Sequence, residues 1–72
     1  MKTQWSHLKH VDRVHQGRNY IITLKGFTDK AEAEAFMRHQ NETNYVYFPR
    51  ELAIWEENGE WFLKMSEADS CD

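Results

Sequence analysis

Histidines near the N-terminus are the first candidates for chemistry in this 72-residue chain. His7, His10 and His15 lie close together, and Asp12 between them could add a fourth ligand. A zinc site needs three or four such groups converging on one point. The spacing matches no zinc pattern, and in an extended strand His10 and Asp12 would share a face while His15 points to the other. We therefore expect surface histidines, with no metal site and no cofactor.

Hydroxyl, thiol and carboxylate groups give little support for catalysis. The candidate nucleophiles lie in or near the expected chain ends: Ser6, Ser66, Ser70 and Cys71. Nucleophilic catalysis also needs a base and an orienting group, which these positions do not offer. The three glycines, Gly17, Gly26 and Gly59, form no phosphate-binding loop. We predict that the protein is not an enzyme, and no small-molecule substrate is evident.

An aromatic pair, Trp55 and Phe62, is the sharpest candidate for an interaction site. Asn58-Gly59 is the favoured pair for a two-residue type I′ turn, because both central residues need φ > 0. With this turn, Trp55 faces Phe62 across two strands, and Glu57 faces Glu60 at the tip. Trp is enriched among the residues that dominate interface energies. We predict a partner-binding surface at this hairpin, formed by Trp55, Phe62, Glu57 and Glu60.

The alternative is that the aromatic pair only stabilises the sheet. A cross-strand pair of this kind is worth roughly 0.2–1 kcal/mol. The N-terminal segment would then fold over the pair, and Trp5 could supply the cover.

The net charge of −3 is unevenly distributed. The first 25 residues hold one acid, Asp12, and five bases: Lys2, Lys9, Arg13, Arg18 and Lys25. Residues 51–72 hold seven acids and one base. This is not the overall basic character of a general nucleic-acid binder. It indicates either a solvated surface whose charges segregate, or an acidic surface that could occupy a basic groove on another protein.

One helix is expected to begin after Thr28 or Asp29. Asp29 and Glu32 have the spacing of a capping box, and the alanine-rich segment that follows favours helix. One mostly apolar stripe results from four residues at helical intervals: Ala33, Phe36, Met37 and Gln40. The polar segment 41–44 should end the helix.

Strands are expected before and after this helix in the sequence. Residues 19–25 are β-rich, with Tyr20, Ile22 and Leu24 on one face. Residues 45–48 could form a short strand stopped by Pro49. In the last hairpin, the Asn58-Gly59 turn places five residues on the face that should contact the helix: Leu52, Ile54, Trp61, Leu63 and Met65.

Residues 4–16 have two interpretations. Helical intervals separate four of them: Trp5, Leu8, Val11 and His15. Alternatively, Gln16-Gly17 could turn a hairpin between Val11–His15 and the strand that follows. The strand is favoured because Val11 and Val14 are β-branched and a sequential hairpin is the simplest partner for a buried strand.

The prediction is a small α+β fold, with an antiparallel β-sheet of about four strands and one α-helix packed on one face. The order would be β-β-α-β-β-β, the third strand being short or irregular. We expect one domain over residues 1–72, with a flexible acidic tail over residues 66–72. Because no apolar run is long enough for a membrane helix or a signal peptide, a cytoplasmic location is expected.

Residues 19–37 consist of a β-rich run, Gly26-Phe27 and a capped alanine-rich helix. This segment resembles the strand, Gly-Phe corner and helix of SPOR domains, which bind denuded peptidoglycan glycans. The resemblance covers about a quarter of the chain and implies a glycan-binding domain. The family's second helix has no counterpart after Met65.

Three functions therefore follow from the sequence. The first is a non-enzymatic protein-interaction module, acting as a regulator, adaptor or inhibitor, for example of a nucleic-acid-binding protein. The second is a nucleic-acid-binding module that uses Lys2, Lys9, Arg13, Arg18 and Lys25 against phosphates. The third is the glycan-binding domain that the resemblance implies.

Overall fold

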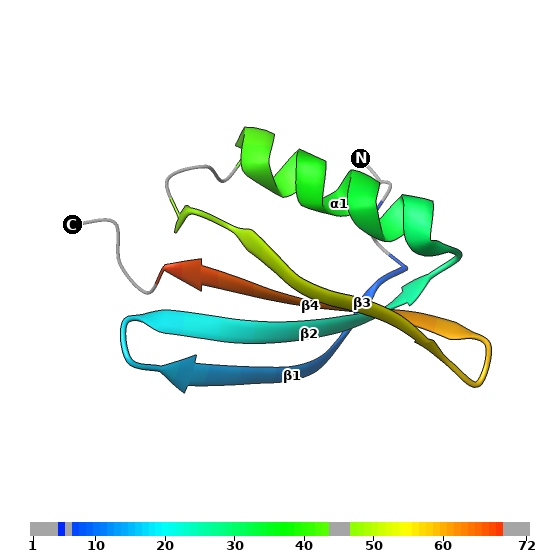
Figure 1. Cartoon of the computed structure of the whole chain (residues 1–72), viewed down its shortest axis with the longest axis horizontal. Coiled ribbons are helices and arrows are strands. Elements are labelled where there is room, and N and C mark those ends of the chain that lie inside the picture. Colours follow the sequence, from blue (N-terminus) through cyan, green and yellow to red (C-terminus); the bar gives the residue numbers. More distant parts are fainter. Residues whose placement is uncertain (1–4, 6, 44–46, 69–72) are drawn as a thin grey trace.

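The structure is a computed structural model, and it describes Trp5 and residues 7–43 and 47–68. Four strands and one helix follow in the order β-β-α-β-β (Figure 1): β1 (Lys9–Gln16), β2 (Asn19–Phe27), α1 (Lys30–Thr43), β3 (Arg50–Glu57) and β4 (Glu60–Ala68). The strands form one antiparallel sheet in the order β1-β2-β4-β3. Helix α1 lies along one face of this sheet (Figure 1). The predicted α+β class, with an antiparallel sheet and one helix, is confirmed.

The described residues form one strand fewer than the predicted order. The difference lies in the connection between α1 and β3. Residues 47–49 are not in a strand, and Phe48 has a φ of 49° with a side chain that is 72% exposed. A positive φ interrupts an extended backbone, so the short strand predicted over residues 45–48 is wrong where the structure describes it. Its first two residues lie outside the described part of the chain.

The N-terminal hairpin follows the strand interpretation of residues 4–16. Gln16 pairs with Asn19, so the turn consists of Gly17 and Arg18, one residue later than predicted. Gly17 has a φ of 63°, which glycine adopts without steric cost. The helical interpretation of this segment is wrong for β1.

Helix α1 begins with the predicted capping contacts. The Asp29 side chain accepts a hydrogen bond from the Glu32 amide at 2.8 Å. The Glu32 carboxylate reaches back to the Thr28 amide at 2.6 Å. These two bonds satisfy amides that have no partner within the helix.

The core lies between α1 and the sheet. Its buried apolar residues come from β2, α1 and β4: Ile22, Leu24, Phe27, Ala33, Phe36, Met37, Leu63 and Met65. The apolar stripe of α1 was predicted, as was the shared face of Ile22 and Leu24 on β2. Trp5 and Leu8 pack against the same cluster, so these two residues also lie on the helix side of the sheet.

The β3–β4 hairpin has the predicted register near its turn and departs from it farther away. Trp55 pairs with Phe62 and Ile54 pairs with Leu63, but Glu51 pairs with Met65 because a bulge falls at Leu52. A bulge adds one unpaired residue and shifts the side chains beyond it to the other face. Leu52 is therefore 48% exposed, and its predicted inward position is wrong.

β4 also extends farther than predicted. Ser66, Glu67 and Ala68 pair with Ile21, Tyr20 and Asn19, so these three residues belong to the sheet. The long β2 offers backbone partners up to its first residue, which is why β4 continues. The predicted tail is therefore wrong for residues 66–68, and residues 69–72 lie outside the described part of the chain.

Gly26 allows the N-terminal segment to approach β2 closely. It lies in a bulge between Lys25 and Phe27 and has a φ of 108°. A Cβ atom there would lie 3.0 Å from the His7 carbonyl oxygen. Alanine would therefore meet both an unfavourable backbone conformation and a steric contact with backbone atoms.

We expect Gly26→Ala to lower the free energy of unfolding by about 1 kcal/mol more than Gly17→Ala. Gly17 is the matched control, because its φ is also positive but a Cβ there would have no atom within 4 Å. Urea denaturation followed by circular dichroism measures both variants. Equal losses would show that the close approach of His7 does not require glycine.

Candidate interaction surface

The face of the sheet opposite α1 carries the predicted aromatic pair. Residues paired across antiparallel strands lie on the same face, so the register assigns each side chain. The face away from α1 includes these side chains: Asp12, Val14, Ile21, Thr23, Lys25, Ala53, Trp55, Phe62 and Lys64. None of the described helices or strands covers this face (Figure 1). We call it the open face.

Trp55 and Phe62 are stacked on the open face. Their ring centroids are 5.2 Å apart and their planes differ by 7°, so the rings are parallel. Both side chains are half-buried. The predicted cross-strand contact on the face away from the helix is thus confirmed.

Trp5 does not cover this pair. It packs edge-on against Phe36 of α1, with ring centroids 5.2 Å apart and an interplanar angle of 83°. Because Phe36 is in the core beneath α1, Trp5 lies on the opposite side of the sheet. The predicted cover of the aromatic pair by Trp5 is wrong.

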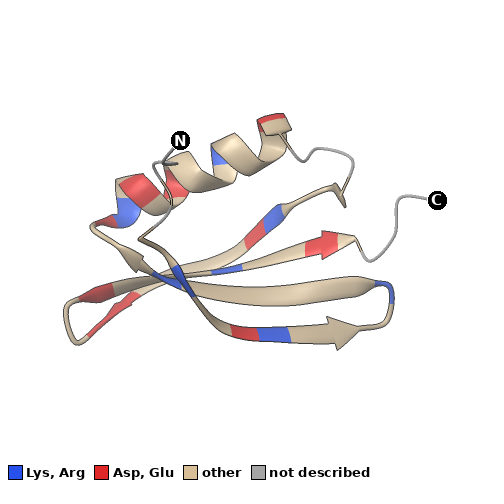
Figure 2. Ribbon diagram, turned by 180° about the vertical axis from the view of Figure 1, so that it is seen from behind, with Lys and Arg blue, Asp and Glu red and all other residues tan. Residues whose placement is uncertain are grey.

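Two carboxylates flank the stacked rings. The Trp55 indole Nε1–H donates a hydrogen bond to Glu57 Oε1 at 3.1 Å. On β4, Glu60 Oε1 lies 3.9 Å from Lys25 Nζ, with both side chains at least one-third exposed. Figure 2 shows the acidic residues gathered at the β3–β4 turn. We define the hairpin patch as Trp55, Phe62, Glu57 and Glu60.

Lys25 was predicted only as a phosphate-binding residue, and its place beside the hairpin patch was not foreseen. It pairs with Phe62 in the register of β2 and β4. Its ion pair with Glu60 is exposed, and exposed pairs contribute only about 0–1 kcal/mol. Breaking this pair therefore costs little.

The basic residues predicted for nucleic-acid binding do not gather on one surface. Lys9 pairs with Lys25 on the open face, whereas Arg13 pairs with Ile22 on the helix side. The Arg13 Cζ lies 4.3 Å from the centroid of the Tyr20 ring, and Arg18 is in the β1–β2 turn. Lys2 lies outside the described residues.

The N-terminal histidines also differ from their predicted arrangement. A bulge between His10 and Asp12 places His10 with Leu24 and Asp12 with Thr23, so these two residues lie on opposite faces. His15 stacks on Tyr20 on the same side as His10. No group of three or more ligand side chains that could hold a metal occurs among the described residues.

The Glu32 carboxylate joins the N-terminal segment to the start of α1. Its Oε1 accepts hydrogen bonds from the Thr28 amide and hydroxyl, and its Oε2 lies 3.2 Å from His7 Nε2. Partial burial raises the pKa of this carboxyl. The hydrogen bonds from Thr28 and His7 outweigh that effect, so the pKa lies below its ordinary value of 4.5.

A lowered pKa in the folded state makes ionised Glu32 stabilising above pH 4.5 and removes this contribution as the pH falls through the folded-state value. We expect Glu32→Gln to lose about 1 kcal/mol of unfolding free energy at neutral pH and to show a weaker decrease on acidification. Glu34→Gln, at an exposed position of the same helix, is the control. Urea denaturation across the acidic range tests this, and parallel curves for wild type and Glu32→Gln would contradict it.

Helix α1, the one helix in the described part of the chain, is too short and too polar to cross a membrane. Comparisons of the chain with protein-family models, curated proteins and solved structures gave no match.

Proposed function

We propose that the protein is a small non-enzymatic interaction module that binds a basic segment of another protein through the hairpin patch. The observation that carries this proposal is the parallel stack of Trp55 and Phe62 on the open face, flanked by Glu57 and Glu60. When that basic segment belongs to a nucleic-acid-binding groove, the module acts as an inhibitor, because it occupies the surface that phosphates would contact.

A cationic side chain matches this patch better than a neutral or acidic one. The planar guanidinium of arginine stacks on aromatic rings, and its N–H donors suit carboxylate oxygens. Glu57 is already held at the edge of the Trp55 ring by a hydrogen bond. Less side-chain freedom is therefore lost when a cation binds.

The patch alone is smaller than a complete interface. Specific protein interfaces bury roughly 800 Å² on each partner. The exposed side chains next to the patch on the open face include Ala53 and Lys64, which are small or polar. We expect the hairpin patch to contribute most of the binding free energy. The contacts of the partner with these neighbours should contribute less.

A charge-matched pair of variants tests the proposal. The probe is a fluorescently labelled peptide of alternating arginine and glycine, with binding followed by fluorescence anisotropy. Glu57→Gln/Glu60→Gln removes two charges from the hairpin patch, and Glu34→Gln/Glu42→Gln removes two exposed charges from α1. We expect the first variant to bind about tenfold more weakly, at roughly 0.7 kcal/mol per carboxylate, and the second to resemble wild type.

Two outcomes would count against the proposal. Equal weakening of both variants would show that net charge alone attracts the peptide. Salt-sensitive binding of a DNA or RNA oligonucleotide, without binding of the peptide, would favour the nucleic-acid-binding alternative instead.

A further inference from the structure

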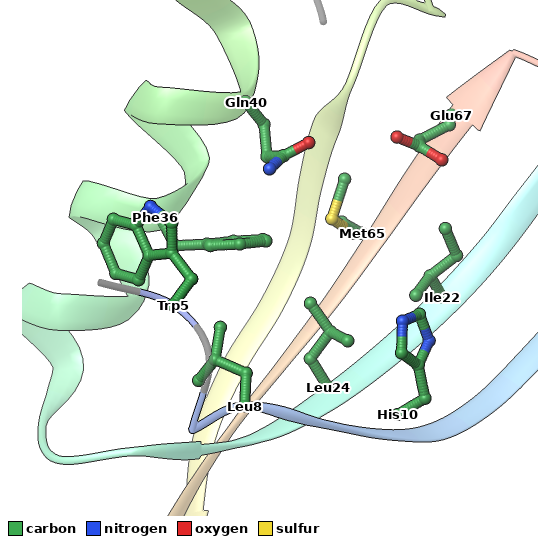
Figure 3. A pocket seen from close by; sticks show the side chains of 9 residues that line it. All are labelled: Trp5, Leu8, His10, Ile22, Leu24, Phe36, Gln40, Met65 and Glu67. Carbon is green, nitrogen blue, oxygen red and sulfur yellow. The ribbon is translucent and has the colours of Figure 1, made fainter. Parts of the chain in front are cut away.

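A hollow of about 310 Å³ lies on the helix side of the sheet, opposite the open face (Figure 3). Its lining comes from Trp5 and Leu8 and from the elements β1, β2, α1 and β4. This volume is at the low end of the range for small-molecule sites, roughly 300–1,000 Å³. The hollow is separate from the hairpin patch, so a ligand site there is independent of the proposed function.

The base and one wall of the hollow are apolar. Ile22, Leu24 and Met65 project into it from β2 and β4, and all three are buried in the core (Figure 3). The edge-on contact between Trp5 and Phe36 fixes the wall beside α1. Trp5 and Leu8 in the same lining are only half-buried, so an apolar ligand body could replace water over their accessible surface with a gain from the hydrophobic effect.

One carboxylate faces this apolar surface. Glu67 lies two residues after Met65 on β4, so both project from the same face of the strand. Its side chain is half-buried and is directed toward the hollow (Figure 3). It forms no hydrogen bond or ion pair with any of the residues that the structure describes.

No lysine or arginine in the described part of the chain forms an ion pair with Glu67. The residues lining the hollow include no lysine or arginine, and the polar ones besides Glu67 are His10 and Gln40. Arg13 is on the same side of the sheet, but its guanidinium lies over the Tyr20 ring. A half-buried carboxylate beside an apolar surface favours a ligand that brings a positive charge and apolar atoms together.

We propose that this hollow binds a small organic cation with an apolar body, such as an arylalkylamine. The apolar body contacts Leu24, Ile22 and Met65. The ammonium group donates hydrogen bonds to the Glu67 carboxylate.

The probe is phenethylamine, compared with 2-phenylethanol and 3-phenylpropionate as neutral and anionic molecules of similar size. Binding is followed by ¹H–¹⁵N correlation spectra of the whole chain. We expect phenethylamine to bind about tenfold more tightly than either comparison molecule, as is typical of a hydrogen bond to a charged group. Its largest shifts should map to residues that line the hollow.

Variants of Glu67 decide the role of the carboxylate. Glu67→Gln should remove the preference for the cation, and Glu67→Lys should reverse it in favour of 3-phenylpropionate. Glu34→Gln, at an exposed position of α1 outside the lining of the hollow, is the control and should leave the preference unchanged. If Glu67→Lys does not fold, Glu67→Gln alone decides, because it preserves the size of the side chain.

Three results would overturn the proposal. Equal binding of the three probes would leave an apolar hollow without selectivity for charge. Shifts confined to the hairpin patch would place the amine on Trp55 instead. The absence of any shift with phenethylamine would show that the hollow does not bind this class of ligand.

Discussion

Leu63→Ala is expected to lower the free energy of unfolding by about 2–5 kcal/mol. Leu63 is fully buried at 0% exposure, and β4 lies between β2 and β3 in the sheet. Alanine would leave a cavity between Leu24 and Ile54, the cross-strand neighbours of Leu63. Since a domain of this size has a total stability of only about 4–11 kcal/mol, the variant should be largely unfolded in moderate urea.

Leu52→Ala is the matched control for this prediction. The same chemical change at a bulge residue that is 48% exposed should alter the free energy of unfolding by less than about 0.5 kcal/mol. Urea denaturation followed by tryptophan fluorescence measures both variants. Comparable losses in the two variants would mean that β3 continues its regular register and that Leu52 points into the core.

Trp55→Ala is expected to weaken binding of the basic segment by about thirtyfold, or roughly 2 kcal/mol. The substitution removes the largest ring of the hairpin patch and also releases Glu57, which the indole holds by a hydrogen bond. The cost to folding should be smaller, at about 1 kcal/mol, because the stacked pair contributes only as a cross-strand contact on the open face. The labelled arginine–glycine peptide and urea denaturation measure the two effects separately.

Two further tryptophan variants separate the ring from its hydrogen bond. Trp55→Phe retains an aromatic ring opposite Phe62 but removes the donor to Glu57, so we expect a loss of only a few-fold. Trp61→Phe changes an indole on the helix side of β4 and should leave the affinity unchanged. Wild-type affinity in Trp55→Ala would exclude the stacked pair from binding.

The features that local sequence predicts best are those fixed by a few adjacent residues. The capping contacts of α1 need only Asp29 and Glu32, and the apolar stripe of the helix follows from its regular period. The turn at Asn58-Gly59 sets the register of its hairpin as far as Ala53. For this reason the stacking of Trp55 and Phe62, three residues from the turn, could be predicted.

The strand faces that were predicted wrongly lie at or beyond β-bulges. The bulges at Leu52 and between His10 and Asp12 each reverse the face of the side chains that lie farther from the hairpin turn. Neither bulge has a glycine or proline to mark it, since the residues concerned are Leu52 and Val11. The bulge near Gly26 is the exception, because that glycine could have indicated one.

The side-chain contacts of the two candidate sites depend on tertiary structure. The contact between Lys25 and Glu60 joins strands separated by α1 and β3 in the sequence. The hollow beside Glu67 exists because α1, Trp5 and Leu8 enclose apolar residues of β2 and β4. No local pattern in the sequence specifies either arrangement.

The most direct test of the hairpin patch is a ¹H–¹⁵N correlation titration of the full chain with the arginine–glycine peptide. The Trp55 side-chain Nε1–H should show the clearest shift, because it donates to Glu57 within the patch. The amides of Glu57, Glu60 and Phe62 should shift with it, while those of the β1–β2 turn remain in place. Shifts centred on Gly17 and Arg18, or an unchanged Trp55 Nε1–H signal at saturating peptide, would contradict binding at the hairpin patch.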